Sequence, residues 1–125
     1  METLNIPAGY NRVMPYLIVK NAAAFIEFTK YVLGAIEKYK VMRDEKLIMH
    51  AEISLGDSVI MIADATEIYN EQPAGLFVYV EDCDKAYQKA MDNGAESVSR
   101  PSDQQYGRSA GIKDKFGNTW WMTSV

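Results

Sequence analysis

A repeated unit is the feature of this chain that most constrains its fold. The stretch 14–35, MPYLIVKNAAAFIEFTKYVLGA, opens with an apolar strand pattern and continues as an amphipathic helix that ends at Gly34. The stretch 75–95, GLFVYVEDCDKAYQKAMDNGA, repeats this order and its helix ends at Gly94. Because the copies lie roughly 60 residues apart, the sequence predicts two copies of one supersecondary unit.

Strand and turn signals give the order of elements within each copy. In the first copy we expect a helix capped by Asn21 and strands at 13–20, 36–43, 46–55 and 58–63. In the second copy we expect a helix at 82–93, a loop at 101–107, and strands at 75–80, 97–100 (short), 108–113 and 119–124. Each copy therefore reads βαβββ. We expect one α+β domain made of two repeats, at about 12–64 and 74–125.

Composition favours a globular protein that binds neither nucleic acid nor membrane. Apolar residues make up 48% of the 125 residues and charged residues 24%, which is typical of a folded domain. The formal net charge is −4 and there is no run of Lys or Arg, so attraction to nucleic acid or an anionic membrane is not expected. No apolar run approaches the length of a membrane span, and no secretory signal is visible. A single cysteine, Cys83, fits a cytoplasmic protein.

A tight turn fixes the register of one hairpin. Gly56 and Asp57 form a two-residue turn between apolar runs, so Leu55 is expected to pair with Ser58. The same register pairs Ser54 with Val59, Glu52 with Met61 and His50 with Ala63. Paired residues share a face of a sheet, so one face of this hairpin carries His50, Glu52, Ser54 and Met61.

Five stretches of the chain carry a resemblance to a known family. These are PYLIV, AAAFIEFTKYVLGA, HAEISLGDSVIMIAD, FVYVEDCDKAYQKAMDNGA and YGRSAGIKDKFGNTWWM. Together they resemble the vicinal-oxygen-chelate superfamily, also called the glyoxalase, bleomycin-resistance and extradiol-dioxygenase superfamily, and within it the PhnB-like branch. The resemblance implies two cupped βαβββ modules that enclose a cavity, with helices outside. It also implies a homodimer, in which each chain forms its own cup or the modules are exchanged between chains.

The resemblance also locates the metal site of metal-dependent relatives. Their four ligands map here to Met14, Met61, Gly75 and Trp121. Catalytic divalent metals of this class prefer imidazole nitrogen and carboxylate oxygen, whereas thioethers suit soft copper(I). Glycine offers no side-chain donor, and indole offers only an N–H. We therefore expect no metal at this site and no cofactor.

If Met61 faces the cavity, strand alternation gives the other side chains that line it. The predicted lining is aromatic and thioether-rich, with one imidazole and one carboxylate: Met14, Tyr16, His50, Glu52, Met61, Phe77, Tyr79 and Trp121. Such a lining favours a flat or partly apolar organic ligand. Tyr106 and Arg108, near the predicted loop, are candidate lid residues, and Arg108 suits an anionic group.

Ordinary structural roles compete with these functional ones. His50 and Glu52 form either a buried polar pair or a catalytic pair in which burial raises the pKa of Glu52 and makes it a general base. The rings and thioethers are also typical of a core.

Three functions therefore remain open. The first is a metal-free binding protein, similar to the antibiotic-sequestering members of the superfamily. The second is a lyase, isomerase or dioxygenase-like enzyme that uses His50 and Glu52 as a base or as two ligands of a displaced metal. The third is a paralogue that has lost its chemistry and only dimerises.

Overall fold

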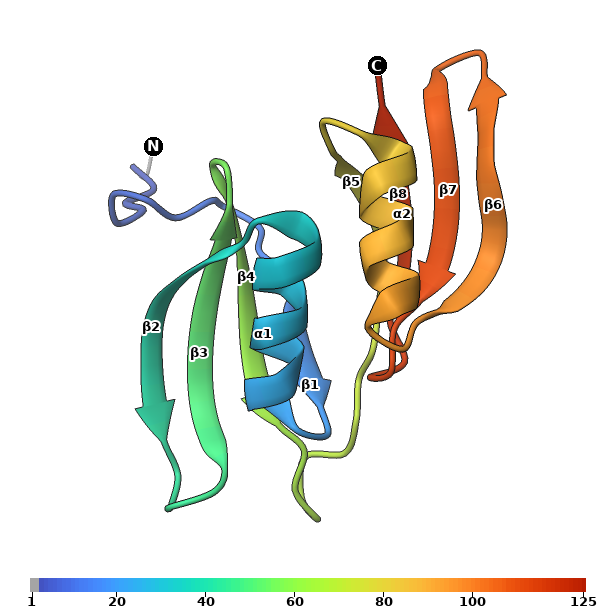
Figure 1. Ribbon diagram of the computed structural model, residues 1–125. Coiled ribbons are helices and arrows are strands. Elements are labelled where there is room, and N and C mark those ends of the chain that lie inside the picture. Colours follow the sequence, from blue (N-terminus) through green and yellow to red (C-terminus); the bar gives the residue numbers. More distant parts are fainter. Residues whose placement is uncertain (1–2) are drawn as a thin grey trace.

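The computed structural model describes residues 3–125, which form two four-stranded sheets with one helix each (Figure 1). The first module, our name for the elements from β1 to β4, comprises β1 (Tyr16–Val19), α1 (Ala22–Leu33), β2 (Ile36–Met42), β3 (Ile48–Leu55) and β4 (Ser58–Asp64). The second module comprises β5 (Gly75–Tyr79), α2 (Cys83–Asp92), β6 (Glu96–Gln104), β7 (Gly107–Lys113) and β8 (Thr119–Ser124). The predicted order βαβββ is confirmed in both modules, and the fold is α+β.

Both sheets have the same topology. The strand order is β1-β4-β3-β2 in one sheet and β5-β8-β7-β6 in the other, with the first pair parallel and the other pairs antiparallel. The predicted hairpin register is confirmed, because Glu52 pairs with Met61 and Leu55 pairs with Ser58. The outer strands continue this line of paired residues across the first sheet, because Tyr39 of β2 lies opposite Glu52 and Tyr16 of β1 lies opposite Met61. These four side chains therefore share one face of the sheet.

Helix α1 begins and ends where the sequence predicts. The side chain of Asn21 accepts a hydrogen bond from the backbone N–H of Ala24, which satisfies one of the free amides of the first turn. Gly34 ends the helix in the left-handed conformation (φ 72°), and its N–H donates to carbonyls of the last turn. Within residues 3–125, neither helix has the length and apolar character needed to cross a membrane.

The predicted short strand at 97–100 and loop at 101–107 are wrong. Strand β6 runs through this region as far as Gln104, and a two-residue turn at Gln105 and Tyr106 leads directly into β7. Pro101 suggested a break, but β6 is an edge strand and its pairing is irregular between Ser99 and Ser102. A proline is tolerated at such a position because no ladder hydrogen bond is required of its nitrogen.

The two modules share one apolar core through their helices. Figure 1 shows α1 in front of β4 and β1 and α2 in front of β5 and β8, and the two helices pack against each other. Phe25 of α1 is fully buried, lies edge-on to Phe116 (ring centroids 5.4 Å apart) and stacks on Trp120 of β8 (6.5 Å). Buried residues from both modules form a single cluster around these rings. Each sheet therefore turns its helix-covered face toward the other module.

Candidate functional site

Each sheet also has a face that is turned away from its helix, which we call the open face. The first open face carries Tyr16, Tyr39, His50, Glu52 and Met61, and the second carries Phe77, Tyr79, Ser99, Gly111 and Trp121. The five large aromatic side chains in these sets are between 40% and 67% exposed. An exposed set of rings of this size on a sheet is typical of a binding or association surface rather than of a plain solvated face.

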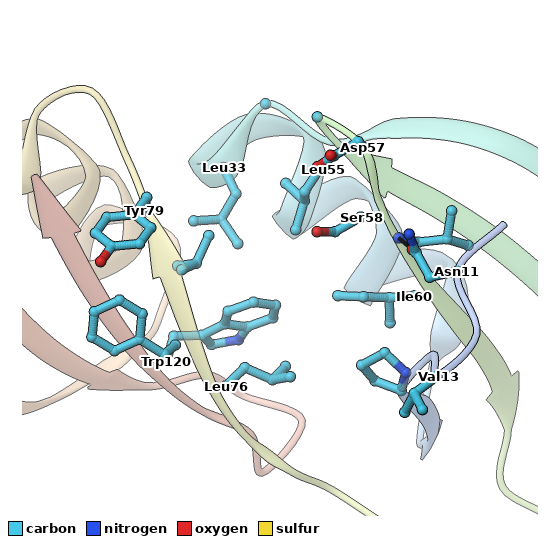
Figure 2. A pocket seen from close by; sticks show the side chains of 16 residues that line it. Asn11, Val13, Leu33, Leu55, Asp57, Ser58, Ile60, Leu76, Tyr79 and Trp120 are labelled. Carbon is cyan, nitrogen blue, oxygen red and sulfur yellow. Dashed lines mark hydrogen bonds between the residues drawn. The ribbon is translucent and has the colours of Figure 1, made fainter. Parts of the chain in front are cut away.

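The two open faces of one chain point away from each other. A cleft of about 580 Å³ separates the modules, and Ile60 and Trp120 face each other across it (Figure 2). Both residues belong to the helix-covered faces. Phe77 and Tyr79 border the same cleft where it meets β5, although strand alternation places their side chains on the opposite face of that strand (Figure 2). The structure therefore brings the predicted lining residues together in two separate groups, one on each open face. The chain alone does not place Tyr16 and Trp121 on opposite walls of one cavity.

The second open face is an aromatic platform with a glycine floor. Trp121 lies against Gly111, because a Cβ atom added to Gly111 would come within 2.4 Å of the indole ring. Phe77 contacts Tyr79 edge-on, with ring centroids 5.2 Å apart. Tyr106, in the β6–β7 turn, extends this platform with its ring centroid 6.5 Å from that of Phe77. Phe77, Tyr79, Tyr106 and Trp121 are thus placed together; that they contact a ligand stays a prediction.

The first open face contains a continuous chain of hydrogen bonds. The Tyr16 hydroxyl lies 3.2 Å from Nδ1 of His50, and Nε2 of His50 lies 2.8 Å from Oε2 of Glu52. The other carboxylate oxygen, Oε1, accepts a hydrogen bond from the Tyr10 hydroxyl. Exposure decreases along this chain, from an exposed Tyr16 through a half-buried His50 to a buried Glu52. Four polar side chains therefore connect the surface of the sheet to a buried carboxylate.

The pKa of Glu52 is lowered, which contradicts the alternative in which burial raises it. Burial is the largest single influence and acts to raise it, but the hydrogen bonds from Tyr10 and His50 and the charge of His50 together outweigh burial. Glu52 is therefore held as a carboxylate at neutral pH. A stabilised carboxylate is a weaker general base, so the predicted role of Glu52 as the proton-abstracting group is not supported.

The N-terminal arm, residues 3–13, covers part of the first open face. A hollow of about 570 Å³ lies beneath it, lined by arm residues including Ile6 and Tyr10 and by Met14, Glu52 and Met61 of the sheet. Sequence reasoning missed Tyr10 and Tyr39. Tyr39 follows from the alternation of β2 once its pairing with β3 is known, whereas nothing in the irregular arm indicated that Tyr10 would reach Glu52.

Arg108 does not lie at a cavity mouth. Its guanidinium makes two hydrogen bonds to the carboxylate of Asp84 on α2, at 2.7 and 3.1 Å, and one to Asp103 at 3.1 Å. The hydrogen bonds from Arg108 lower the pKa of Asp84. The hydrogen bonds to Asp84 and to Asp103 raise the pKa of Arg108. Arg108 faces the helix side of its sheet and is already paired with two carboxylates, so this geometry does not favour its role as an anion-binding lid residue, which stays a prediction.

The residues at the inherited metal positions do not suit a catalytic divalent metal. Met14 and Met61 lie beside the hollow under the arm, whereas Gly75 and Trp121 belong to the other module. Two thioethers, an indole and a glycine supply no hard donor. Across residues 3–125, His, Cys, Asp and Glu nowhere form a group of three that could hold a metal ion.

Comparison with known proteins identifies the family. The family model described as Glyoxalase/Bleomycin resistance protein/Dioxygenase superfamily matches residues 9–122, so the chain belongs to this superfamily. A protein of Mycobacterium bovis is 26% identical over 118 residues, which cover 85% of this chain and 78% of that protein. A protein of Mycobacterium tuberculosis matches to the same extent and is covered over 69% of its length.

Solved structures share the fold at low sequence identity. TioX from Micromonospora sp. ML1 superposes with a TM-score of 0.73 at 20% identity, covering 92% of this chain and 96% of TioX. A PhnB protein from Bacillus cereus gives a TM-score of 0.75 at 17% identity, covering 92% and 100%. The fosfomycin resistance protein FosX from Mesorhizobium loti gives 0.67 at 14% identity, covering 90% of each chain. At these identities the likeness concerns the fold alone.

Proposed function

We propose that this protein binds an aromatic or partly apolar small molecule, without a metal, in a cavity formed by two copies of the chain. The first open face of one copy and the second open face of the other form its two walls. The functional unit is then a homodimer with exchanged modules. The single cysteine, Cys83, is buried and agrees with a cytoplasmic location, which stays a prediction.

One observation carries this proposal: the aromatic open faces point away from the core that the two modules share. Phe77 and Tyr79 are 52% and 67% exposed, and Tyr16 and Tyr39 are 46% and 53% exposed on the other sheet. A second copy related by a two-fold axis would supply the missing wall twice, because a symmetric dimer repeats each contact. Burying these rings around a ligand removes apolar surface from water, which is favourable.

The charges and shapes of the two walls indicate the kind of ligand. The aromatic platform around Trp121 offers ring faces for stacking and for cation–π contacts. The opposite wall holds Met61 beside the ionised carboxylate of Glu52. A planar molecule with a delocalised positive charge satisfies both walls, because its ring stacks while its charge is attracted by the carboxylate.

Dye binding tests this function. We expect the planar cationic dye thioflavin T to bind, with a rise in dye fluorescence and with quenching of the tryptophan emission. Trp121→Ala should weaken binding by about ten-fold, because one stacking contact is lost. Tyr31→Phe, on the outer surface of α1, is the matched control and should bind as the wild type does. An unchanged affinity in Trp121→Ala, or no binding by the wild type, would contradict the proposal. Because no metal takes part in the proposed binding, a metal chelator should leave the affinity unchanged.

A second candidate function is an enzyme of the same superfamily that uses His50 and Glu52. The observation that favours it is the 2.8 Å contact between His50 Nε2 and Glu52 Oε2 beside an exposed hydroxyl. The variant with a displaced metal is the weaker form of this candidate, because a catalytic zinc-type site usually needs three protein ligands.

A further inference from the structure

The structure assigns an order to the polar chain on the first open face, and this order is that of a proton-transfer triad. We propose that Tyr16, His50 and Glu52 form an acid–base site in which the Tyr16 hydroxyl touches the ligand. The aromatic platform of the opposite wall favours an aryl group, and a hydroxyl backed by an imidazole can take up a proton only from an acidic C–H, so the substrate class that fits is an aryl ketone with a C–H between two carbonyl groups. The proposal rests on the proposed binding cavity, since Tyr16 belongs to one of its walls.

Hydrogen-bond chemistry assigns the direction of the chain. An ionised carboxylate only accepts hydrogen bonds, so the nitrogen that contacts Glu52, Nε2 of His50, carries the proton. A neutral imidazole has only one N–H, so Nδ1 has a free lone pair. The hydroxyl 3.2 Å from Nδ1 belongs to Tyr16, which donates its hydrogen bond to the imidazole when the ring is neutral. The His50 imidazole thus contacts the Tyr16 hydroxyl through one nitrogen and the Glu52 carboxylate through the other, which is the arrangement of known nucleophile–histidine–carboxylate triads.

The surroundings of Glu52 support this assignment. Its second oxygen accepts from the Tyr10 hydroxyl, so both carboxylate oxygens are held in place. The same hydrogen bonds favour the ionised form, and together with the electrostatic attraction of His50 they outweigh the effect of burial. A fixed negative charge next to Nε2 stabilises the imidazolium that forms when His50 takes up a second proton. The positioning residues are thus already arranged for proton uptake before a ligand binds.

The reaction can be written with all protons accounted for. The substrate C–H transfers its proton to the Tyr16 oxygen while the Tyr16 hydroxyl proton moves to Nδ1 of His50. The electron pair of the broken C–H bond forms the carbon–carbon double bond of an enolate. Return of the proton through the same path to the enolate oxygen gives the enol and restores the neutral imidazole. No metal, oxidant or reductant is required for this tautomerisation.

Exposure along the chain determines which residue meets the ligand. Tyr16 is 46% exposed on the open face, whereas Glu52 is 6% exposed and lies under the arm. The tyrosine hydroxyl is therefore the member of the triad that a ligand in the cavity can reach. His50 and Glu52 act through it as positioning residues.

The tautomer of His50 can be read without any ligand. His50 is the only histidine of the chain, so its ring nitrogens give one set of ¹⁵N NMR signals that needs no assignment by mutation. In the neutral imidazole we expect a protonated Nε2 and an unprotonated Nδ1. Tyr16→Phe should shift the Nδ1 signal, because the hydrogen bond to that nitrogen is lost, and Tyr31→Phe should not. A protonated Nδ1 with a bare Nε2 would overturn the proposal.

Activity is tested with benzoylacetone, a neutral aryl β-diketone whose enol absorbs in the ultraviolet. We expect the wild type to accelerate the relaxation of added enol toward the keto form, and Tyr16→Phe to lose about 100-fold of this acceleration, in the range of general acid–base effects. Glu52→Gln should lower the rate more than it lowers benzoylacetone affinity, measured by tryptophan quenching, because benzoylacetone carries no positive charge for the carboxylate to attract.

The outcomes separate this proposal from the proposed binding function. A wild type that binds thioflavin T and benzoylacetone but does not accelerate relaxation overturns the triad and leaves the binding function intact. A wild type that binds neither compound and is inactive overturns both. Equal activity in Tyr16→Phe and the wild type overturns the assignment of Tyr16 even if some catalysis is present.

Discussion

Replacing Phe25 with alanine should destabilise both modules together, although Phe25 belongs only to the first. The side chain is 0% exposed and contacts Phe116 and Trp120 of the second module. Phe→Ala substitutions at buried sites cost about 3–5 kcal/mol. Each aromatic contact contributes about 0.5–1.5 kcal/mol beyond burial, so a large part of the loss falls on the boundary between the modules. We expect a loss of about 4 kcal/mol in the free energy of unfolding.

Urea unfolding at one fixed protein concentration measures this loss. Both tryptophans of the chain lie in β8, so tryptophan fluorescence reports the second module, whereas far-UV circular dichroism reports both helices. We expect one coincident transition in both signals, shifted to lower urea in Phe25→Ala. The matched control is Tyr31→Ala on the same helix, whose exposed ring lies 5.5 Å from the Lys89 ammonium of α2. This control should lose below about 1 kcal/mol.

A fluorescence transition that stays at its wild-type midpoint in Phe25→Ala would refute the reasoning. The second module would then fold independently of the first. The shared core, and with it the opposite orientation of the two open faces, would have to be given up.

Three further predictions concern single side chains. Asp114→Ala should lower the free energy of unfolding by about 3 kcal/mol in thermal or urea denaturation, because this buried carboxylate accepts from two backbone amides and from Trp120 Nε1. The pKa of Glu52 is lowered below its ordinary 4.5, so the ionised carboxylate stabilises the fold above pH 4.5 and this stabilisation is lost as the pH falls further. An acid-unfolding series should show the loss in the wild type and not in Glu52→Gln. Gly111→Ala should displace the Trp121 ring, which a new Cβ would meet at 2.4 Å, and should shift the tryptophan emission and weaken thioflavin T binding several-fold. An unchanged free energy of unfolding in Asp114→Ala would contradict the first prediction. The same acid unfolding in the wild type and Glu52→Gln would contradict the second, and an unchanged tryptophan emission in Gly111→Ala would contradict the third.

Local patterns in the sequence were sufficient for the order of the elements, for the ends of α1 and for one hairpin register. Asn21 and Gly34 mark the ends of α1 because capping depends on neighbouring residues alone. The pairing of Glu52 with Met61 follows from a two-residue turn and from the period of a strand. These inferences needed no knowledge of the rest of the fold.

Inferences that depended on long-range contacts were less successful. Pro101 indicated a loop, but the partner strand β7 carries the pairing past it. The sequence suggested Arg108 as a residue that binds an anionic ligand, but its guanidinium forms ion pairs with Asp84 and Asp103. Burial of Glu52 predicted a raised pKa, and the opposite result depends on Tyr10, which is 42 residues away in the chain. Charge partners of this kind are set by tertiary structure and leave no local signal.

The orientation of the modules was also beyond the sequence. The strand pattern places Met61 and Trp121 on the open faces, but the same pattern is compatible with one cup per chain or with exchanged modules. Contact between Phe25 and Trp120 decides the orientation within the chain, because it brings the two helix-covered faces together.

Complementation between two binding-deficient variants tests the central claim most directly. Met61→Lys damages the first open face, Trp121→Ala damages the second, and each variant alone should bind thioflavin T poorly. If the cavity combines faces from two chains, a mixed dimer contains one cavity with both faces intact, so refolding the variants together should restore part of the wild-type binding. If each chain forms its own cavity, the mixed sample will bind no better than the two variants measured separately.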